Sequence, residues 1–156
     1  MPSFTTTRRV RHHASDMFDL VADVESYPAF VPLCERLTVR KREALPDGRN
    51  LLVADMTVAY RVFRETFASK VTLDKANLQI LVEYLDGPFS SLQNRWRFVP
   101  TGERACEIEF FIDYEFRSRM LGMLMGGVFE TAFRRFAEAF ERRADAVYGG
   151  TTAARA

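Results

Sequence analysis

The last third of the chain constrains the fold most, because a segment with the periodicity of a strand runs directly into one with the periodicity of a helix. Between Arg104 and Phe116 apolar residues alternate with mostly acidic ones, which is typical of a half-buried strand. From about Ser118 the apolar residues recur at steps of three and four, so they form one stripe of a helix. We therefore expect a helix laid across a sheet, with a pocket rather than a closed core beneath it. The strand face comprises Cys106, Ile108, Phe110, Ile112, Tyr114 and Phe116, and the helix stripe comprises Leu121, Met125, Phe129, Phe133, Phe136 and Phe140.

Seven strands are predicted in all, and turn signals such as Pro46-Asp47-Gly48 and Asp86-Gly87-Pro88 separate most of them. Short turns between successive strands imply an antiparallel sheet, so the predicted class is α+β with helices packed on one face. Two short helices, or one helix and a bend, are expected between Ser15 and Pro32. Residues 1–148 are predicted to form a single domain and residues 149–156 a flexible tail. The predicted strands are 3–11, 37–44, 50–60, 61–73, 78–85, 91–99 and 104–116.

A turn over residues 100–103 predicts the register of the hairpin that the last two strands form. On the outer face it places Arg97 near Glu107, so that opposite charges attract across the strands. On the inner face it places Trp96 near Ile108. The charge pattern and the apolar pattern agree, which supports the hairpin.

Composition and charge limit the classes of function. The net charge of +1 supplies no excess of positive charge for binding DNA or RNA, although residues 36–42 contain a short basic run. The sequence has no signal-peptide pattern and no run of about 20 apolar residues, and Cys34 and Cys106 lack metal-ligand spacing. These observations favour a cytoplasmic protein. The 14 Phe residues indicate either an aromatic-rich core or an apolar cavity lined by rings.

Motifs for catalysis are weak. His12 and His13 are adjacent, and we interpret both as surface residues at a strand end. No catalytic residue, metal or catalytic cofactor is predicted. Asn94 and Glu65 fall on faces that are otherwise apolar, where each either pairs internally or offers a hydrogen bond to a ligand. A single carboxylate such as Glu65 is only a weak enzyme signal.

Three glycines near the start of the long helix weaken its first turns, by roughly 1 kcal/mol each relative to alanine. They are Gly122, Gly126 and Gly127. One interpretation is close packing of the helix on the sheet. The other is a flexible lid whose methionines, such as Met123, make adaptable apolar contacts and touch an anionic lipid surface.

Five spaced motifs stand out along the chain: Tyr27-Pro28-x-Phe30-x-Pro32-x-Cys34, Glu65-x-Phe67-x-Ser69-x-Val71, Gly87-Pro88-Phe89, Trp96-x-Phe98-x-Pro100 and Asp113-x-x-Phe116-x-Ser118. Together they resemble the signature of the coenzyme Q-binding, START-like polyketide cyclase/dehydrase family. The resemblance covers about residues 3–148, and Leu33 stands where family members often have Trp.

The resemblance implies a helix-grip fold, in which a curved antiparallel sheet wraps the C-terminal helix around a hydrophobic tunnel. We expect the tunnel to bind ubiquinone or a similar polyprenyl lipid without catalysis, in support of respiratory electron transport and with peripheral contact at the inner membrane. Asn94, and alternatively Glu65, would hold the polar head. The expected lining is Met56, Phe67, Val71, Ile80, Trp96, Phe110, Ile112, Phe129 and Phe133, and the expected mouth is Tyr27, Pro28, Phe30 and Pro32.

Two other functions remain open, because the resemblance also extends to ribosome association toxins and aromatic cyclases. A toxin would bind the large ribosomal subunit through a basic surface such as residues 36–42. A cyclase or dehydrase would need an acid or base deep in the pocket, and Glu65 is the candidate.

Overall fold

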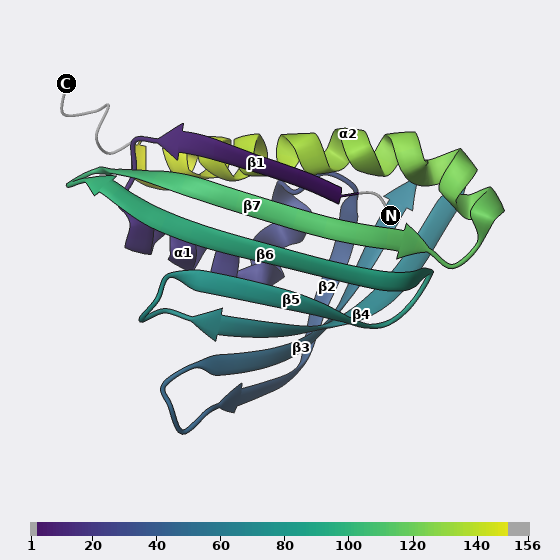
Figure 1. Ribbon diagram of the computed structural model, residues 1–156, viewed down its shortest axis with the longest axis horizontal. Coiled ribbons are helices and arrows are strands. Elements are labelled where there is room, and N and C mark those ends of the chain that lie inside the picture. Colours follow the sequence, from purple (N-terminus) through teal and green to yellow (C-terminus); the bar gives the residue numbers. More distant parts are fainter. Residues whose placement is uncertain (1–2, 150–156) are drawn as a thin grey trace.

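A seven-stranded antiparallel sheet curves around one long helix in the computed structural model, which describes residues 3–149 (Figure 1). The strands follow the order β1-β7-β6-β5-β4-β3-β2, so the first strand pairs with the last. This architecture confirms the predicted α+β class and the helix-grip arrangement. The elements are β1 (Ser3–Val10), α1 (Ala14–Ala22), the 3-10 helix η1 (Val24–Ala29), β2 (Cys34–Ala44), β3 (Asn50–Tyr60), β4 (Phe63–Asp74), β5 (Gln79–Asp86), β6 (Phe89–Gly102), β7 (Ala105–Phe116), α2 (Arg119–Ala144) and the π-helical turn η2 (Asp145–Gly149). Of the predicted tail, residues 150–156 lie outside the described part.

The helix α2 begins at a side-chain cap and buries one stripe. The Ser118 hydroxyl accepts a hydrogen bond from the Leu121 amide at 3.2 Å, which satisfies one free donor of the first turn. The helix packs on β1, β7 and α1. Its buried residues are Met125, Phe129, Ala132, Phe133, Ala137, Phe140 and Ala144, which confirms most of the predicted stripe, while Leu121 and Phe136 are only half-buried. None of the helices described within residues 3–149 is long and apolar enough to cross a membrane.

The register of the β6–β7 hairpin differs from the prediction by two residues. Arg97 pairs with Glu109, not with Glu107, and Trp96 pairs with Phe110, not with Ile108. The reason is that β6 continues through Pro100 to Gly102 across a bulge, so the chain turns two residues later than the Pro-Thr-Gly signal indicates. A shift of two keeps each side chain on its predicted face, and the cross-strand charge pair forms between Arg97 and Glu109 at 3.4 Å.

The turn η2, which follows α2, contacts both α1 and the connection between β1 and α1. His12 Nε2 lies 2.7 Å from Asp145 Oδ1, and the Tyr148 hydroxyl donates to the Asp16 carbonyl at 3.4 Å. His12 is buried, which corrects its interpretation as a surface residue. His12 is buried by tertiary packing, because η2 lies against the connection between β1 and α1.

Two glycines give opposite expectations for substitution by alanine. We predict that Gly127→Ala raises the free energy of unfolding by about 1 kcal/mol, because Gly127 is an exposed helical residue whose added Cβ meets no atom within 4 Å. Gly87→Ala should lower it by at least about 2 kcal/mol, because Gly87 has φ +145° and its Cβ would lie 2.5 Å from Phe67 Cβ. Urea denaturation measures both, and a Gly127→Ala protein less stable than the parent would contradict the account.

Candidate functional site

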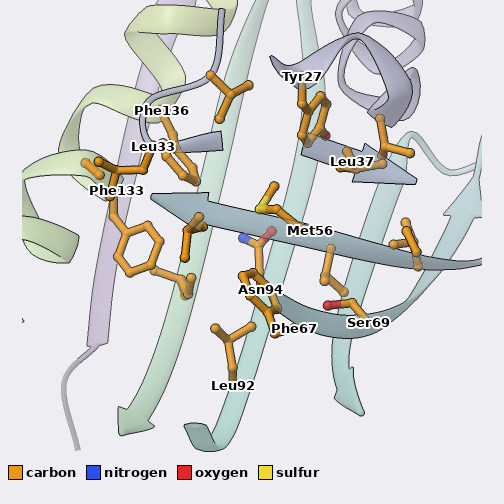
Figure 2. Close-up of a pocket in the computed structure, with 18 of the residues that line it drawn as sticks. Tyr27, Leu33, Leu37, Met56, Phe67, Ser69, Leu92, Asn94, Phe133 and Phe136 are labelled. Carbon is orange, nitrogen blue, oxygen red and sulfur yellow. The ribbon is translucent and has the colours of Figure 1, made fainter. Parts of the chain in front are cut away.

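An apolar cavity lies between the inner face of the sheet, the helix α2 and the segment that connects η1 to β2 (Figure 2). The cavity has a volume of about 100 Å³, whereas a cavity needs roughly 10–15 Å³ to hold one water molecule. The cavity therefore has room for a substantial part of an organic ligand. Its position follows from the packing of α2, which lies against β1 and β7 and leaves the inner faces of β3 to β5 uncovered.

Most of the residues predicted for the site are brought together around this cavity. The sheet contributes inward-facing residues of six strands, β2 to β7, and α2 contributes its buried stripe. The predicted residues found in the wall are Tyr27, Pro32, Met56, Phe67, Val71, Ile80, Asn94, Trp96, Ile112, Phe129 and Phe133.

Four predicted residues lie outside the wall. Phe110 is fully buried, but it packs against Trp96 with ring centroids 4.7 Å apart beneath α2. Phe30 packs on the last turns of α2, with its ring 5.1 Å from that of Phe140, and Pro28 is exposed. Glu65 is exposed near the start of β4, so the structure does not support its candidacy as an acid, base or head-group ligand within the cavity.

The wall also contains residues that were not among those predicted to line the site. Some share a strand face with predicted residues and could have been found from the alternation, such as Ala54, Ser69 and Leu92. Leu33 could not, because it adopts a left-handed backbone conformation with φ 68° in the connection before β2. The additional residues are Val24, Val31, Leu33, Leu37, Ala54, Val58, Ser69, Val82, Phe89, Leu92, Ala132, Phe136 and Phe140.

Polar groups in the wall are few, and Asn94 is central among them. Its side-chain oxygen accepts a hydrogen bond from the Trp96 indole at 2.9 Å, and its nitrogen donates to the Phe111 carbonyl at 2.9 Å. An amide nitrogen carries two N–H groups, so one donor of Asn94 remains. Asn94 therefore pairs internally, which is one of the two interpretations that the sequence allowed. Its remaining N–H group is still available to donate a hydrogen bond to a ligand.

Ser69 is a second polar group of the wall. It is buried on β4, and it lines the cavity. Figure 2 shows Ser69 and Asn94 among the apolar side chains that surround the cavity. A ligand would therefore meet two hydrogen-bond donors, Asn94 and Ser69, in an otherwise apolar wall. This composition is typical of small-molecule sites.

Tyr27 lines the cavity and Cys34 follows the wall residue Leu33, and burial keeps both groups neutral. The Tyr27 hydroxyl donates to the Val21 carbonyl, and burial raises the pKa of Tyr27 well above its ordinary value. Burial also raises the pKa of the Cys34 thiol to about 11. Neither group is therefore ionised near neutral pH, and neither supplies a nucleophile there.

The basic run is largely neutralised by neighbouring acids. Arg40 forms a salt bridge with Asp55, and Arg42 forms one with Glu25. Lys41 lies 3.3 Å from a Glu43 oxygen. Little unpaired positive charge remains in this segment for RNA phosphates.

A curved sheet that grips a C-terminal helix over an apolar cavity defines a START-like protein. The fold is that of a START superfamily protein from Mycobacterium smegmatis, with a TM-score of 0.78 at 22% identity, over 93% of this chain and 98% of that chain. The chain belongs to the family described as polyketide cyclase/dehydrase and lipid transport, whose model matches residues 10–141.

Two groups of relatives carry different names. The chain is 34% identical over 148 residues to the ribosome association toxin RatA of Escherichia coli (strain K12), covering 95% of this chain and 90% of the relative. It is 30% identical over 137 residues to the mitochondrial coenzyme Q-binding protein COQ10 homolog B of Xenopus laevis, covering 85% of this chain and 54% of the relative. The resemblance noted in the sequence is therefore confirmed at the level of the family.

Proposed function

We propose that this protein binds ubiquinone or a similar polyprenyl lipid in its cavity without catalysing a reaction, and thereby supports respiratory electron transport at the inner membrane. The observation that carries the proposal is the cavity itself, which is lined almost wholly by apolar side chains and offers two hydrogen-bond donors. The relative named as a coenzyme Q-binding protein supports the choice of a quinone.

The driving force is the transfer of apolar ligand surface out of water. Burial contributes about 25 cal/mol per Å² of apolar area, so a ring and a few isoprene units give useful affinity after ordering costs. In this proposal the cavity would hold the quinone ring and the first isoprene units, and a longer tail would extend beyond it. The N–H of Asn94 and the hydroxyl of Ser69 would bind the quinone carbonyls.

A proton-transfer role finds less support. Across the described part of the chain, the cavity wall contains no carboxylate, histidine or lysine, and its tyrosine hydroxyl is already hydrogen-bonded. A cyclase or dehydrase moves protons with such groups.

The second candidate function is ribosome association, which the likeness to RatA favours. It predicts that overproduction shifts ribosomal subunits in a sucrose gradient and that the protein co-migrates with the large subunit. Unchanged gradient profiles would count against it. The paired charges of residues 40–42 make the quinone function the better supported of the two.

Ser69→Ala tests the head-group contact directly. We expect the affinity for a short-chain ubiquinone, measured by quenching of Trp96 fluorescence, to fall by two- to about tenfold, because one hydrogen bond contributes about 0.5–1.5 kcal/mol. Stability should change little, because Ser69 lines a cavity and the substitution removes a single oxygen atom from its wall.

Ser91→Ala is the matched control for this measurement. The Ser91 hydroxyl is buried and has no hydrogen-bond partner within residues 3–149, and Ser91 lies outside the cavity wall. The control should bind quinone like the parent protein. Equal affinities of the Ser69→Ala protein and the parent would remove Ser69 from the proposed site.

A further inference from the structure

Exposed hydrophobic side chains gather at one end of the molecule. In this antiparallel meander the β3–β4 turn, the β5–β6 turn and the connection from β7 to α2 all lie at the same end of the sheet, on the right of Figure 1. Seven large hydrophobic residues are exposed among the residues that the structure describes, and six of them lie in or beside these three connections. Such a gathering marks an interaction site. We call it the apolar end; its residues are Tyr60, Val62, Leu85, Met120, Met123 and Leu124.

The exposed face of α2 changes character along the helix. In the first turns its exposed side chains include Met120, Met123 and Leu124, which are 71%, 81% and 70% exposed. These positions follow the i, i+3, i+4 spacing of one helical face, opposite the buried stripe. Further along, the exposed residues are polar or charged, beginning with Glu130 and Thr131. The first turns thus carry an apolar face that the fold itself leaves uncovered.

Arginines accompany the apolar end. Arg61, Arg117 and Arg119 lie in the β3–β4 turn and at the start of α2, and none forms a salt bridge with a residue of the described range 3–149. The first acidic residue of α2 is Glu130, although Asp86 and Glu115 also lie at this end of the sheet. Arginines beside exposed Met and Leu side chains match the phosphates and acyl chains of a lipid surface.

The apolar end adjoins the cavity. Phe63, next to Val62, packs on Phe129 of α2 with ring centroids 6.0 Å apart, so the β3–β4 turn lies beside the first half of α2. The strands β3 and β4 form one wall of the cavity and α2 another. The first half of α2 has a low helix propensity, because it contains Gly126 and Gly127. A Cβ atom added at either glycine would meet no atom within 4 Å, so close packing does not require them.

We propose that the apolar end docks on a phospholipid membrane containing anionic lipids, with Met120, Met123 and Leu124 inserted between the headgroups and the three arginines at the lipid phosphates. Docking presents the cavity to the membrane, so that a lipid ligand passes between them without crossing water. The membrane contact does not depend on the proposed quinone binding. The exchange of a lipid between membrane and cavity rests on the proposed function.

The test compares the full chain with a Met123→Glu/Leu124→Glu protein in sedimentation with vesicles of phosphatidylcholine and phosphatidylglycerol. We expect the partition coefficient to fall at least about tenfold in the variant, because two apolar side chains become charged. Val147→Glu is the matched control, since Val147 is 46% exposed at the opposite end and should leave binding unchanged. An Arg117→Gln/Arg119→Gln protein should lose binding to mixed vesicles and change little on pure phosphatidylcholine.

Binding of a short-chain ubiquinone in vesicle-free buffer separates this proposal from the proposed function. The Met123→Glu/Leu124→Glu protein should bind that quinone like the parent but extract long-chain quinone from vesicles more slowly. A parent protein that does not sediment with vesicles, or a variant that sediments equally, overturns the docking surface while leaving quinone binding intact. Loss of ribosome co-migration in the variant, without any vesicle effect, would assign the surface to the ribosome instead. Absence of quinone binding in the parent and all variants removes the proposed function and leaves the docking result standing.

Discussion

An Ala132→Phe protein is expected to lose at least about tenfold in affinity for a short-chain ubiquinone while remaining folded. Ala132 is buried on α2 and lines the cavity, so an added ring would occupy space that the ligand needs. Because the new side chain enters an existing void, the free energy of unfolding should fall by no more than about 1–3 kcal/mol, the usual cost of overpacking. Fluorescence titration measures the affinity and urea denaturation measures the stability.

Ala139→Phe is the control on the same helix. Ala139 is half-buried but does not line the cavity, so its ring should leave quinone affinity unchanged. If both proteins bound quinone as well as the parent, the ligand would have to bind elsewhere. If Ala132→Phe alone lost affinity, the cavity would be the site.

Phe89→Ala is expected to have the largest effect on stability, with a loss of about 3–5 kcal/mol in the free energy of unfolding. Phe89 is fully buried, and its ring packs against Phe116 and Phe129 at centroid distances of 4.9 Å and 5.8 Å. It also contacts Phe67 and Tyr84, each at 5.7 Å. The ring therefore joins β4, β5, β7 and α2 at one point, and its removal leaves a void that these elements cannot all close.

Phe111→Ala serves as the comparison for that measurement. Phe111 is half-exposed on the outer face of β7, where Arg95 lies over its ring at 5.3 Å. Its loss should cost about 1 kcal/mol or less, as expected for a residue outside the core. Equal costs for the two substitutions in urea denaturation would contradict the central role of the Phe89 cluster.

The strand face of β7 and the stripe of α2 could be predicted because both depend on local periodicity. Ile112 and Phe129 reach the cavity wall as their patterns indicate. The register of β6 on β7 could not be predicted, because it depends on a bulge near Pro100 that leaves no clear signal in the sequence. Alternation identifies the face of a residue more readily than its partner.

Glu65 and Phe110 show a second limit of sequence reasoning. Glu65 shares a strand face with Phe63 and Phe67, as predicted, but it lies where solvent reaches the start of β4. Phe110 also points inward, but α2 packs over it, so it belongs to the core. The position of α2 on the sheet decides which inward residues line the cavity, and that position is set by tertiary packing on β1, β7 and α1.

Mass spectrometry of lipids extracted from the purified protein tests the account most directly. The protein is produced in a bacterium that makes ubiquinone, alongside the Ala132→Phe protein as a control. We predict that a polyprenyl quinone co-purifies with the parent and is depleted in the variant. Recovery of no quinone from the parent, together with no binding of added quinone, would contradict the account.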